Sequence, residues 1–183
     1  MTITGEHDEY LAPVTVLPGT TPANIASDAD DARVEGIILK RLARNRLSAW
    51  EVAHALHDEK IDSERIPAWL ARYEQLGYLN DEALAEELVA SCRGRKSLGK
   101  AAIVHELQRR NIPAAFMHAP LEEISCDEEN TAANALAAKR LTQLNSFDDT
   151  VVRRRLTAFM LRRGYSFETV RGAVDAALSS RDS

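Results

Sequence analysis

Residues 103–124 read IVHELQRRNIPAAFMHAPLEEI, and this stretch decides the fold. Ile103 and Leu107 are about one helical turn apart, so both belong to the apolar face of one helix. Asn111 is a typical C-terminal breaker, and Ile112 and Pro113 are typical of the start of another helix. Apolar residues then recur at helical spacing, at Met117, Leu121 and Ile124. The stretch therefore predicts two consecutive helices joined by a tight turn.

The same pattern occurs three times along the chain. Its anchors are Leu56, Leu107 and Met160, and a breaker with a following apolar residue comes four or five positions after each anchor. These pairs are Lys60-Ile61, Asn111-Ile112 and Gly164-Tyr165. The turn before the anchor repeats Val52, Ile103 and Leu156, and the following helix repeats Ile66, Met117 and Val170, then Leu70, Leu121 and Val174, then Tyr73, Ile124 and Ala177. A period of about 50 residues indicates a repeat architecture.

A further helical stretch precedes each anchor, at about residues 32–44, 81–93 and 128–144. Glycine and proline are sparse in the body of the chain, and no alternating strand pattern occurs. We therefore predict an all-α fold in which three tandem three-helix repeats form an elongated array. A unit of about 50 residues buries little apolar surface alone, so we expect neighbouring units to share their cores. Pro120 should kink or shorten the third helix of the second repeat.

Charge divides the chain into a leader and a body. Residues 1–31 contain six acidic residues, no lysine or arginine, and three prolines, so we expect an acidic, mostly disordered leader. The predicted repeats follow at 32–80, 81–126 and 127–183, the last with a short tail. Outside the leader, 23 basic residues balance 22 acidic ones. The net charge of -5 therefore leaves room for a basic face on the body.

Composition excludes several classes of protein. No apolar run exceeds four residues, which is far short of the roughly 20 that a membrane-spanning helix needs. The N-terminus lacks the basic and apolar layout of a secretory signal, so we expect a cytoplasmic protein without a membrane partner. Cys92 and Cys126 form no CxxC pair and no disulfide framework.

Three patterns that resemble chemical sites fail on their context. Residues 94–100 satisfy the GxxxxGK opening of a phosphate-binding loop, but Ala101 follows where a magnesium-binding hydroxyl is needed, and no strand precedes the glycine. His54 and His57 share a helix face without a third ligand at recognisable spacing. Trp50 and Trp69 have apolar neighbours, and we expect both in core or inter-unit packing rather than stacked on bases. We predict no enzyme, no cofactor and no metal.

Several stretches resemble the RecX family of regulatory proteins. They are Gln75-Leu76-Gly77-Tyr78-Leu79-Asn80-Asp81, Lys96-Ser97-Leu98-Gly99, residues 106–112 (ELQRRNI) and residues 159–165 (FMLRRGY), and the resemblance spans about residues 33–178. It implies a non-enzymatic protein that binds the RecA recombinase filament and restrains its strand-exchange, ATPase and coprotease activities in DNA repair and the SOS response. It supplies a mode of binding and no catalytic residues.

Basic residues near the ends of the helices are the candidate partner-binding residues: Arg93, Arg95, Lys96, Lys100, Arg109, Arg110, Arg153, Arg154, Arg162 and Arg163. The helix dipole accounts for part of this pattern. However, the first repeat has Asp58-Glu59 where the others have Arg109-Arg110 and Arg162-Arg163, which predicts an acidic surface at the first repeat and a basic one at the others. We expect the four arginines to face water.

Two partners remain open at this point. The basic residues can meet acidic residues of a protein filament, phosphates of the DNA inside it, or both. The rival hypothesis is a helical DNA-binding module that acts on the recombinase only by competing for DNA. We also expect a monomer.

Overall fold

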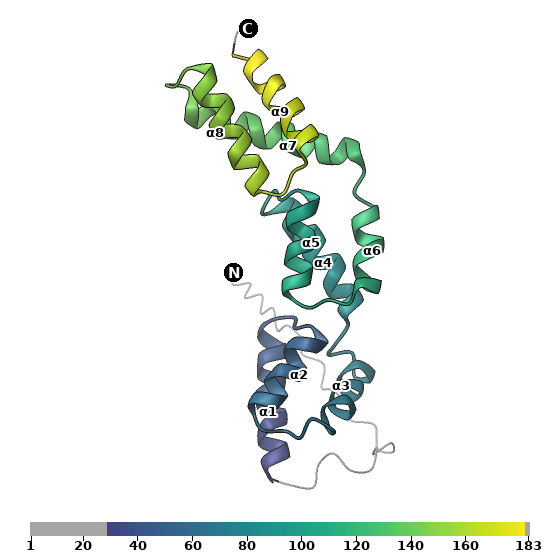
Figure 1. Cartoon of the computed structure of the whole chain (residues 1–183). Helices are drawn as coiled ribbons and strands as arrows, with labels where there is room; N and C mark the ends of the chain where they lie inside the picture. Colours follow the sequence, from purple (N-terminus) through teal and green to yellow (C-terminus); the bar gives the residue numbers. More distant parts are fainter. Residues whose placement is uncertain (1–28, 182–183) are drawn as a thin grey trace, which may run out of the picture.

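The computed structural model describes residues 29–181, and within them it contains nine α-helices and no strand (Figure 1). The all-α prediction is confirmed. The leader's predicted disorder concerns residues 1–28, which lie outside the described residues. The first helix begins at Ala29, so it includes the last three residues of the predicted leader. Asp30 and Asp31 occupy its first turn, where acidic residues favour a helix start.

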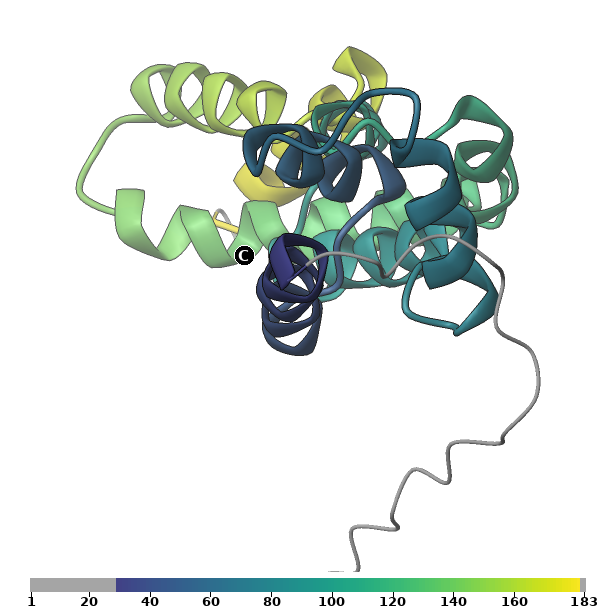
Figure 2. The ribbon, with the colours of Figure 1, turned by 90° about the horizontal axis from the view of Figure 1, so that it is seen from below.

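The helices form three groups of three, which we call units 1, 2 and 3. Unit 1 comprises α1 (Ala29–Arg44), α2 (Ala49–Asp58) and α3 (Ile66–Gln75). Unit 2 comprises α4 (Asp81–Gly94), α5 (Lys100–Arg109) and α6 (Ala114–Glu122). Unit 3 comprises α7 (Cys126–Leu141), α8 (Asp149–Arg162) and α9 (Phe167–Ser179), with a short 3-10 helix, η1 (Thr142–Leu144), after α7. The units follow one another along an elongated molecule, and their helices overlap when it is viewed from one end (Figures 1 and 2).

The predicted repeat describes the turn after each middle helix accurately. The breakers Lys60, Asn111 and Gly164 all have positive φ, at 66°, 49° and 83°. The apolar residues that follow are buried, and each donates its amide hydrogen back to the carbonyl oxygen of the anchor: Ile61 to Leu56 at 3.1 Å, Ile112 to Leu107 at 3.1 Å, and Tyr165 to Met160 at 3.4 Å. This is the hydrogen bond of a Schellman closure. The three anchors are fully buried.

Each unit has its own hydrophobic core. The buried clusters lie within residues 34–79, 84–124 and 133–178, and every pair of helices in extensive contact belongs to one unit. The expectation that neighbouring units share their cores is therefore wrong. The third helix of each unit packs its apolar residues into the core of its own unit, as Trp69 and Tyr73 of α3 do in unit 1. Contacts of another kind must join the units.

Pro120 lies inside α6, which is the shortest of the nine helices in the described part of the chain and ends two residues later, at Glu122. This agrees with the expected shortening, because proline removes a donor from the helix interior. Within residues 29–181, none of the helices is both long and apolar enough to cross a bilayer.

Candidate partner-binding surface

Units 2 and 3 meet where two backbones approach closely, a contact we call joint 2. The start of α5 rests on the end of α8, so that the amide of Gly99 donates to the carbonyl of Arg163 at 2.8 Å and that of Ala101 to Gly164 at 3.2 Å. A Cβ atom on Gly99 would lie 2.5 Å from backbone atoms of Gly164 and Tyr165. Glycine is therefore required here for packing. The Gly99 amide, which a phosphate-binding loop would need, is already used.

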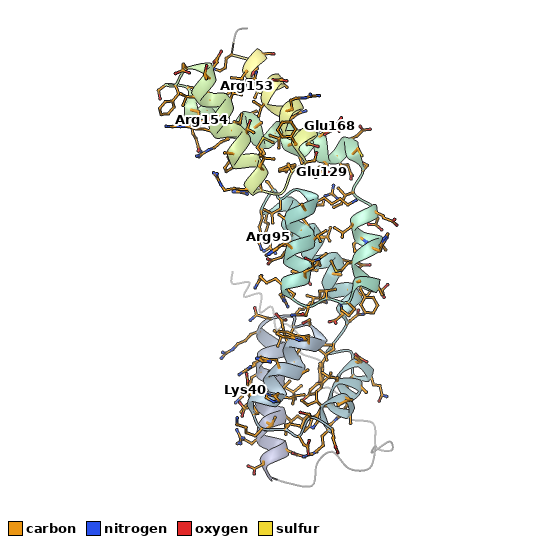
Figure 3. All side chains as sticks on the ribbon, in the orientation of Figure 1. Lys40, Arg95, Glu129, Arg153, Arg154 and Glu168 are labelled. Atoms are coloured by element: carbon orange, nitrogen blue, oxygen red, sulfur yellow. The ribbon has the colours of Figure 1, made fainter. Side chains whose placement is uncertain are left out.

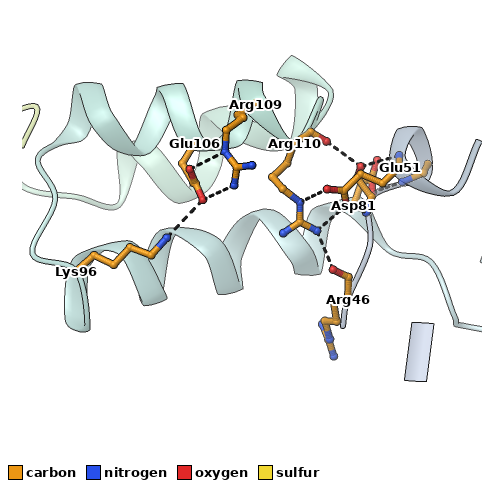
Figure 4. A network of polar contacts seen from close by, with 9 residues as sticks. Arg46, Glu51, Asp81, Lys96, Glu106, Arg109 and Arg110 are labelled. Carbon is orange, nitrogen blue, oxygen red and sulfur yellow. Dashed lines mark hydrogen bonds and ion pairs between the residues drawn. The ribbon is translucent and has the colours of Figure 1, made fainter. Parts of the chain in front are cut away.

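Units 1 and 2 meet at joint 1, which is made by side chains. The hydroxyl of Ser48, the N-cap of α2, donates to the Arg110 carbonyl at 2.8 Å, and the Ala49 amide donates to Asp81 Oδ1 at 2.9 Å. Arg110 returns to unit 1, where its guanidinium lies 2.6 Å from Glu51 Oε1 and donates to the Arg46 carbonyl at 2.7 Å (Figure 4). Burial raises the pKa of Asp81, while the Ala49 hydrogen bond opposes that rise.

The second arginine of each predicted pair therefore serves a joint. Arg110 has a side chain only 16% exposed, and Arg163 donates to the Lys96 carbonyl and stacks on Phe159. The prediction that all four paired arginines face water is wrong for these two. Arg109 and Arg162 are exposed, as predicted. Sequence periodicity could not find this, because these joint contacts connect residues 32 to 67 positions apart.

The position of unit 1 that corresponds to Arg110 and Arg163 is Glu59, at the outer end of the array, where no further unit docks within residues 29–181. Glu59 there accepts a hydrogen bond from Arg33 at 3.0 Å. At the opposite end, Arg181 donates to Asp149 Oδ1 at 2.6 Å and to the Phe147 carbonyl at 3.1 Å. At both ends of the array, the surface that would form a joint is therefore occupied by contacts within the chain itself. The contrast between Glu59 and the arginines follows from the presence or absence of a joint.

Several other candidate bases already have carboxylate partners. Arg93 pairs with Glu128 at 3.0 Å, and Arg153 pairs with Asp175. Arg109 and Lys96 both contact Glu106, at 2.8 and 3.4 Å. The hydrogen bond from Arg109, with the two nearby positive charges, lowers the pKa of Glu106 to about 2. Surface pairs of this kind exchange readily with outside partners, because each contributes little free energy.

The remaining candidates have no carboxylate within 4.0 Å among the described residues. They are Arg95, Lys100, Arg154 and Arg162. Arg95 donates to Ser91 Oγ at 2.8 Å, and the backbone amide of Lys100 donates to Glu129. All four are exposed.

Sequence reasoning also missed a cluster of three such bases at the end of α1, in unit 1. Lys40, Arg41 and Arg44 are exposed at the end of α1 and also lack a carboxylate partner within residues 29–181. The prediction of an acidic surface at the first repeat is therefore incomplete, because it compared only the ends of the middle helices. The sequence did contain a signal for these bases, because Arg41 and Arg44 stand in the last turn of the helix at residues 29–44.

Five of the residues labelled in Figure 3 differ in charge between two sides of the array. Lys40, Arg95 and Arg154 project from the same side, one from each unit, whereas Glu129 and Glu168 lie on the other (Figure 3). We call the first the basic side. An extended positive side suits an extended negative partner.

A groove crosses joint 1. Two shallow hollows of about 390 and 350 Å³ share Asn45, Leu47 and Glu51 in their walls. Together they are lined by six arginines and two glutamates, and we call them the arginine groove. The arginines are Arg41, Arg44, Arg46, Arg95, Arg109 and Arg110. Three of these were candidates from the sequence, and the fold brings them together with the end of α1.

The predictions for the tryptophans and the histidines have different outcomes. Trp69 is buried beside Tyr73, as predicted, but Trp50 is 49% exposed and stacks on His54 with ring centroids 5.2 Å apart. The prediction of core or inter-unit packing is wrong for Trp50. Within the described range, no group of three or more metal-ligating residues is assembled around His54 and His57.

These features define an all-helical repeat protein with exposed basic side chains on each of its three units. Two family models match the chain, described as the second and third three-helix domains of RecX, over residues 80–118 and 127–174. The regulatory protein RecX of Thermobifida fusca is 30% identical over 135 residues, covering 74% of this chain and 73% of that protein. The chain belongs to the RecX family of regulatory proteins, which are non-enzymatic.

Further comparisons agree with this assignment. The regulatory protein RecX of Streptomyces coelicolor is 27% identical over 153 residues, which cover 81% of each chain. The crystal structure of RecX from Lactobacillus salivarius superposes with a TM-score of 0.71 at 17% identity, over 81% of this chain and 96% of that one. The structural match supports the fold, and the sequence matches support the family.

Proposed function

We propose that this protein binds RecA recombinase filaments through its basic side and restrains their recombination, ATPase and coprotease activities in DNA repair and the SOS response. The observation that carries the proposal is the row of unpaired cations contributed by all three units, at Lys40, Arg95 and Arg154 (Figure 3). Charges distributed along an elongated body match a partner that is itself extended and repetitive. Membership of the RecX family supports the same partner.

The contact residues follow from which cations are available. Arg95, Arg154 and Arg162 have no carboxylate within 4.0 Å among residues 29–181, so they are the principal contacts among the sequence candidates. Lys100 also lacks such a carboxylate, but its backbone amide donates to Glu129, which lies on the other side. Arg93, Lys96, Arg109 and Arg153 join the principal contacts by exchanging surface carboxylates for those of the partner. Arg110 and Arg163 act indirectly, because they hold the units in line.

We propose that the protein acts as a monomer. The surfaces that form joints inside the array are closed at its two ends by Arg33 with Glu59 and by Arg181 with Asp149. Head-to-tail addition of a second copy would have to break these ion pairs first. Sedimentation at several protein concentrations tests this, and a mass that rises with concentration contradicts it.

A matched pair of substitutions tests the binding surface. Arg154 and Arg171 both lie in unit 3, are exposed, and lack a carboxylate partner among residues 29–181. Arg171 follows Glu168 by three residues in α9, which places it on the face of that helix that carries Glu168. Arg154→Glu should weaken inhibition of filament ATPase activity by about tenfold, whereas Arg171→Glu should leave it unchanged within about twofold. Equal effects of the two substitutions would contradict the proposed side.

A further inference from the structure

The C-terminal end of α1 carries cations that no acidic residue of the described chain neutralises. Lys40, Arg41 and Arg44, which we call the α1 cluster, are exposed and have no carboxylate within 4.0 Å among residues 29–181. Arg44 follows Lys40 by four residues and Arg41 by three, so it is a neighbour of both on the helix surface. Like charges at these spacings repel one another. A carboxylate beside the cluster would relieve that repulsion.

The opposite end of α1 is surrounded by acidic residues. The turn between α2 and α3 packs beside the start of α1, where Arg33 pairs with Glu59 at 3.0 Å and Arg65 contacts Asp31. The acidic residues at this end are Asp30, Asp31, Asp58, Glu59, Asp62 and Glu64, and the basic ones are Arg33, Lys60 and Arg65. The end is therefore negative overall. An acidic segment attached here is repelled from its point of attachment and attracted toward the α1 cluster.

The part of the chain just before α1 contains such a segment. Residues 6–9 read Glu-His-Asp-Glu, and no lysine or arginine occurs in residues 1–28. Glu9 precedes Ala29 by 20 residues, and a chain of that length spans up to about 66 Å. Lys40 follows Ala29 by 11 residues, which places it about 17 Å further along the helix. Residues 6–9 can therefore reach the α1 cluster with length to spare.

We propose that residues 6–9 bind the α1 cluster of the same chain and shield it from the partner of the basic side. Lys40 belongs to that side (Figure 3), so the bound segment occupies part of the partner-binding surface. The tether gives the segment an effective concentration on the order of 1 mM, at which even a weak charge contact is well populated. The apparent affinity for the partner falls with the fraction of molecules in which the cluster is free. The shielding rests on the proposed function, whereas the contact itself does not.

Carbodiimide crosslinking of the full chain, without a partner, tests the contact. The reagent joins a carboxylate directly to a lysine amine, so only groups in contact react. Lys40 and Lys60 are both exposed, but Lys60 lies at the acidic end, next to the Glu59 that meets Arg33 near the start of α1. Mass spectrometry should find residues 6–9 joined to Lys40 at least about threefold more often than to Lys60.

Two results of this experiment would overturn the contact. Equal yields at the two lysines, or an excess at Lys60, would show the effect of tethering alone. Products that join two copies of the chain, in place of the product within one copy, would assign the α1 cluster to the leader of a second molecule.

A pair of arginine variants tests the role of charge. Arg41→Gln/Arg44→Gln leaves the Lys40 amine in place, so a lower yield at Lys40 reports the lost attraction and not a lost reactive group. We expect the yield to fall at least about twofold. The control is Arg162→Gln/Arg171→Gln, which removes two exposed cations of unit 3 and should leave the yield unchanged. An unchanged yield in Arg41→Gln/Arg44→Gln would overturn the proposal.

Filament binding at low salt tests the shielding. Glu6→Gln/Asp8→Asn/Glu9→Gln should bind RecA filaments about threefold more tightly than wild type. The control Glu74→Gln/Glu86→Gln/Glu123→Gln also removes three negative charges, at exposed residues that have no cationic partner within 4.0 Å in the described part of the chain, and should change the affinity less than about 1.5-fold.

The outcomes separate the shielding from the proposed function. Equal gains in the two triple variants would show a general effect of net charge and overturn the shielding, as would an unchanged affinity in Glu6→Gln/Asp8→Asn/Glu9→Gln. If wild type and this variant both fail to bind filaments, the proposed function fails, and a crosslink that prefers Lys40 still supports the contact within the chain.

Discussion

Replacing Gly99 by alanine isolates the contribution of joint 2. Gly99 has φ -77° and ψ 165°, a conformation that alanine adopts without strain. The added methyl group would lie 2.5 Å from the carbonyl carbon and oxygen of Gly164 and from the amide nitrogen of Tyr165. All three are backbone atoms, so no side-chain rotation relieves the overlap. Units 2 and 3 must move apart instead.

The size of the effect follows from that movement. Restoring an ordinary contact of 3.4 Å needs a shift of about 0.9 Å, which stretches the 2.8 Å bond from Gly99 to Arg163 beyond hydrogen-bond range. The neighbouring bond from Ala101 to Gly164 should weaken with it. Two hydrogen bonds contribute about 1–3 kcal/mol, and alanine returns about 0.4–1 kcal/mol by restricting the unfolded chain. We expect a net destabilisation of about 1–2 kcal/mol.

Urea unfolding followed by circular dichroism measures the loss, and amide hydrogen exchange at Ala101 locates it. Both tryptophans lie in unit 1, so their fluorescence should report a transition that Gly99→Ala hardly changes. Gly36→Ala is the control, because Gly36 is inside α1 with nothing within 4 Å of the place that an added methyl group would take, and it should stabilise the protein by about 1 kcal/mol. A Gly99→Ala protein as stable as wild type would refute the close-contact explanation of joint 2.

Two further predictions concern charged residues. A double-mutant cycle of Arg110→Ala and Glu51→Ala should give a coupling free energy of about 1–3 kcal/mol, measured by urea unfolding, and a value near zero would remove this pair from joint 1. In an NMR titration, the Glu106 carboxyl should have a pKa of about 2 in wild type and a higher one in Arg109→Ala. Because the folded-state pKa is lowered, the stability from this pair should be present above pH 4.5 and lost as the pH falls toward 2.

The repeat was predictable because its signals are local. An anchor such as Leu107, a breaker such as Asn111 and a buried apolar residue such as Ile112 lie within six positions, and helix geometry fixes what each must do. The same pattern in three copies identified the all-α fold and the middle helix of every unit. It also located the turns to within a residue.

The joints were not predictable, because nothing local marks their partners. Gly99 resembles any glycine between two helices until Gly164 is placed against it, and Arg110 resembles a helix-end arginine until Glu51 meets it. The expectation of shared cores failed because it assumed that apolar surface must join the units. Hydrogen bonds and ion pairs join them, and these leave no periodic trace in the sequence.

The separation of the cores has a consequence for how the chain is made. Each core uses one continuous stretch of sequence, so its contacts form at short loop-closure cost, and such topologies fold fast. During synthesis, unit 1 can complete its core once Leu79 has left the ribosome, before unit 2 has emerged. Joint 1 can form only after Arg110 has emerged, and joint 2 only after Gly164 has emerged. The nascent chain therefore never has to expose more than about one unit's apolar surface to the cell at a time.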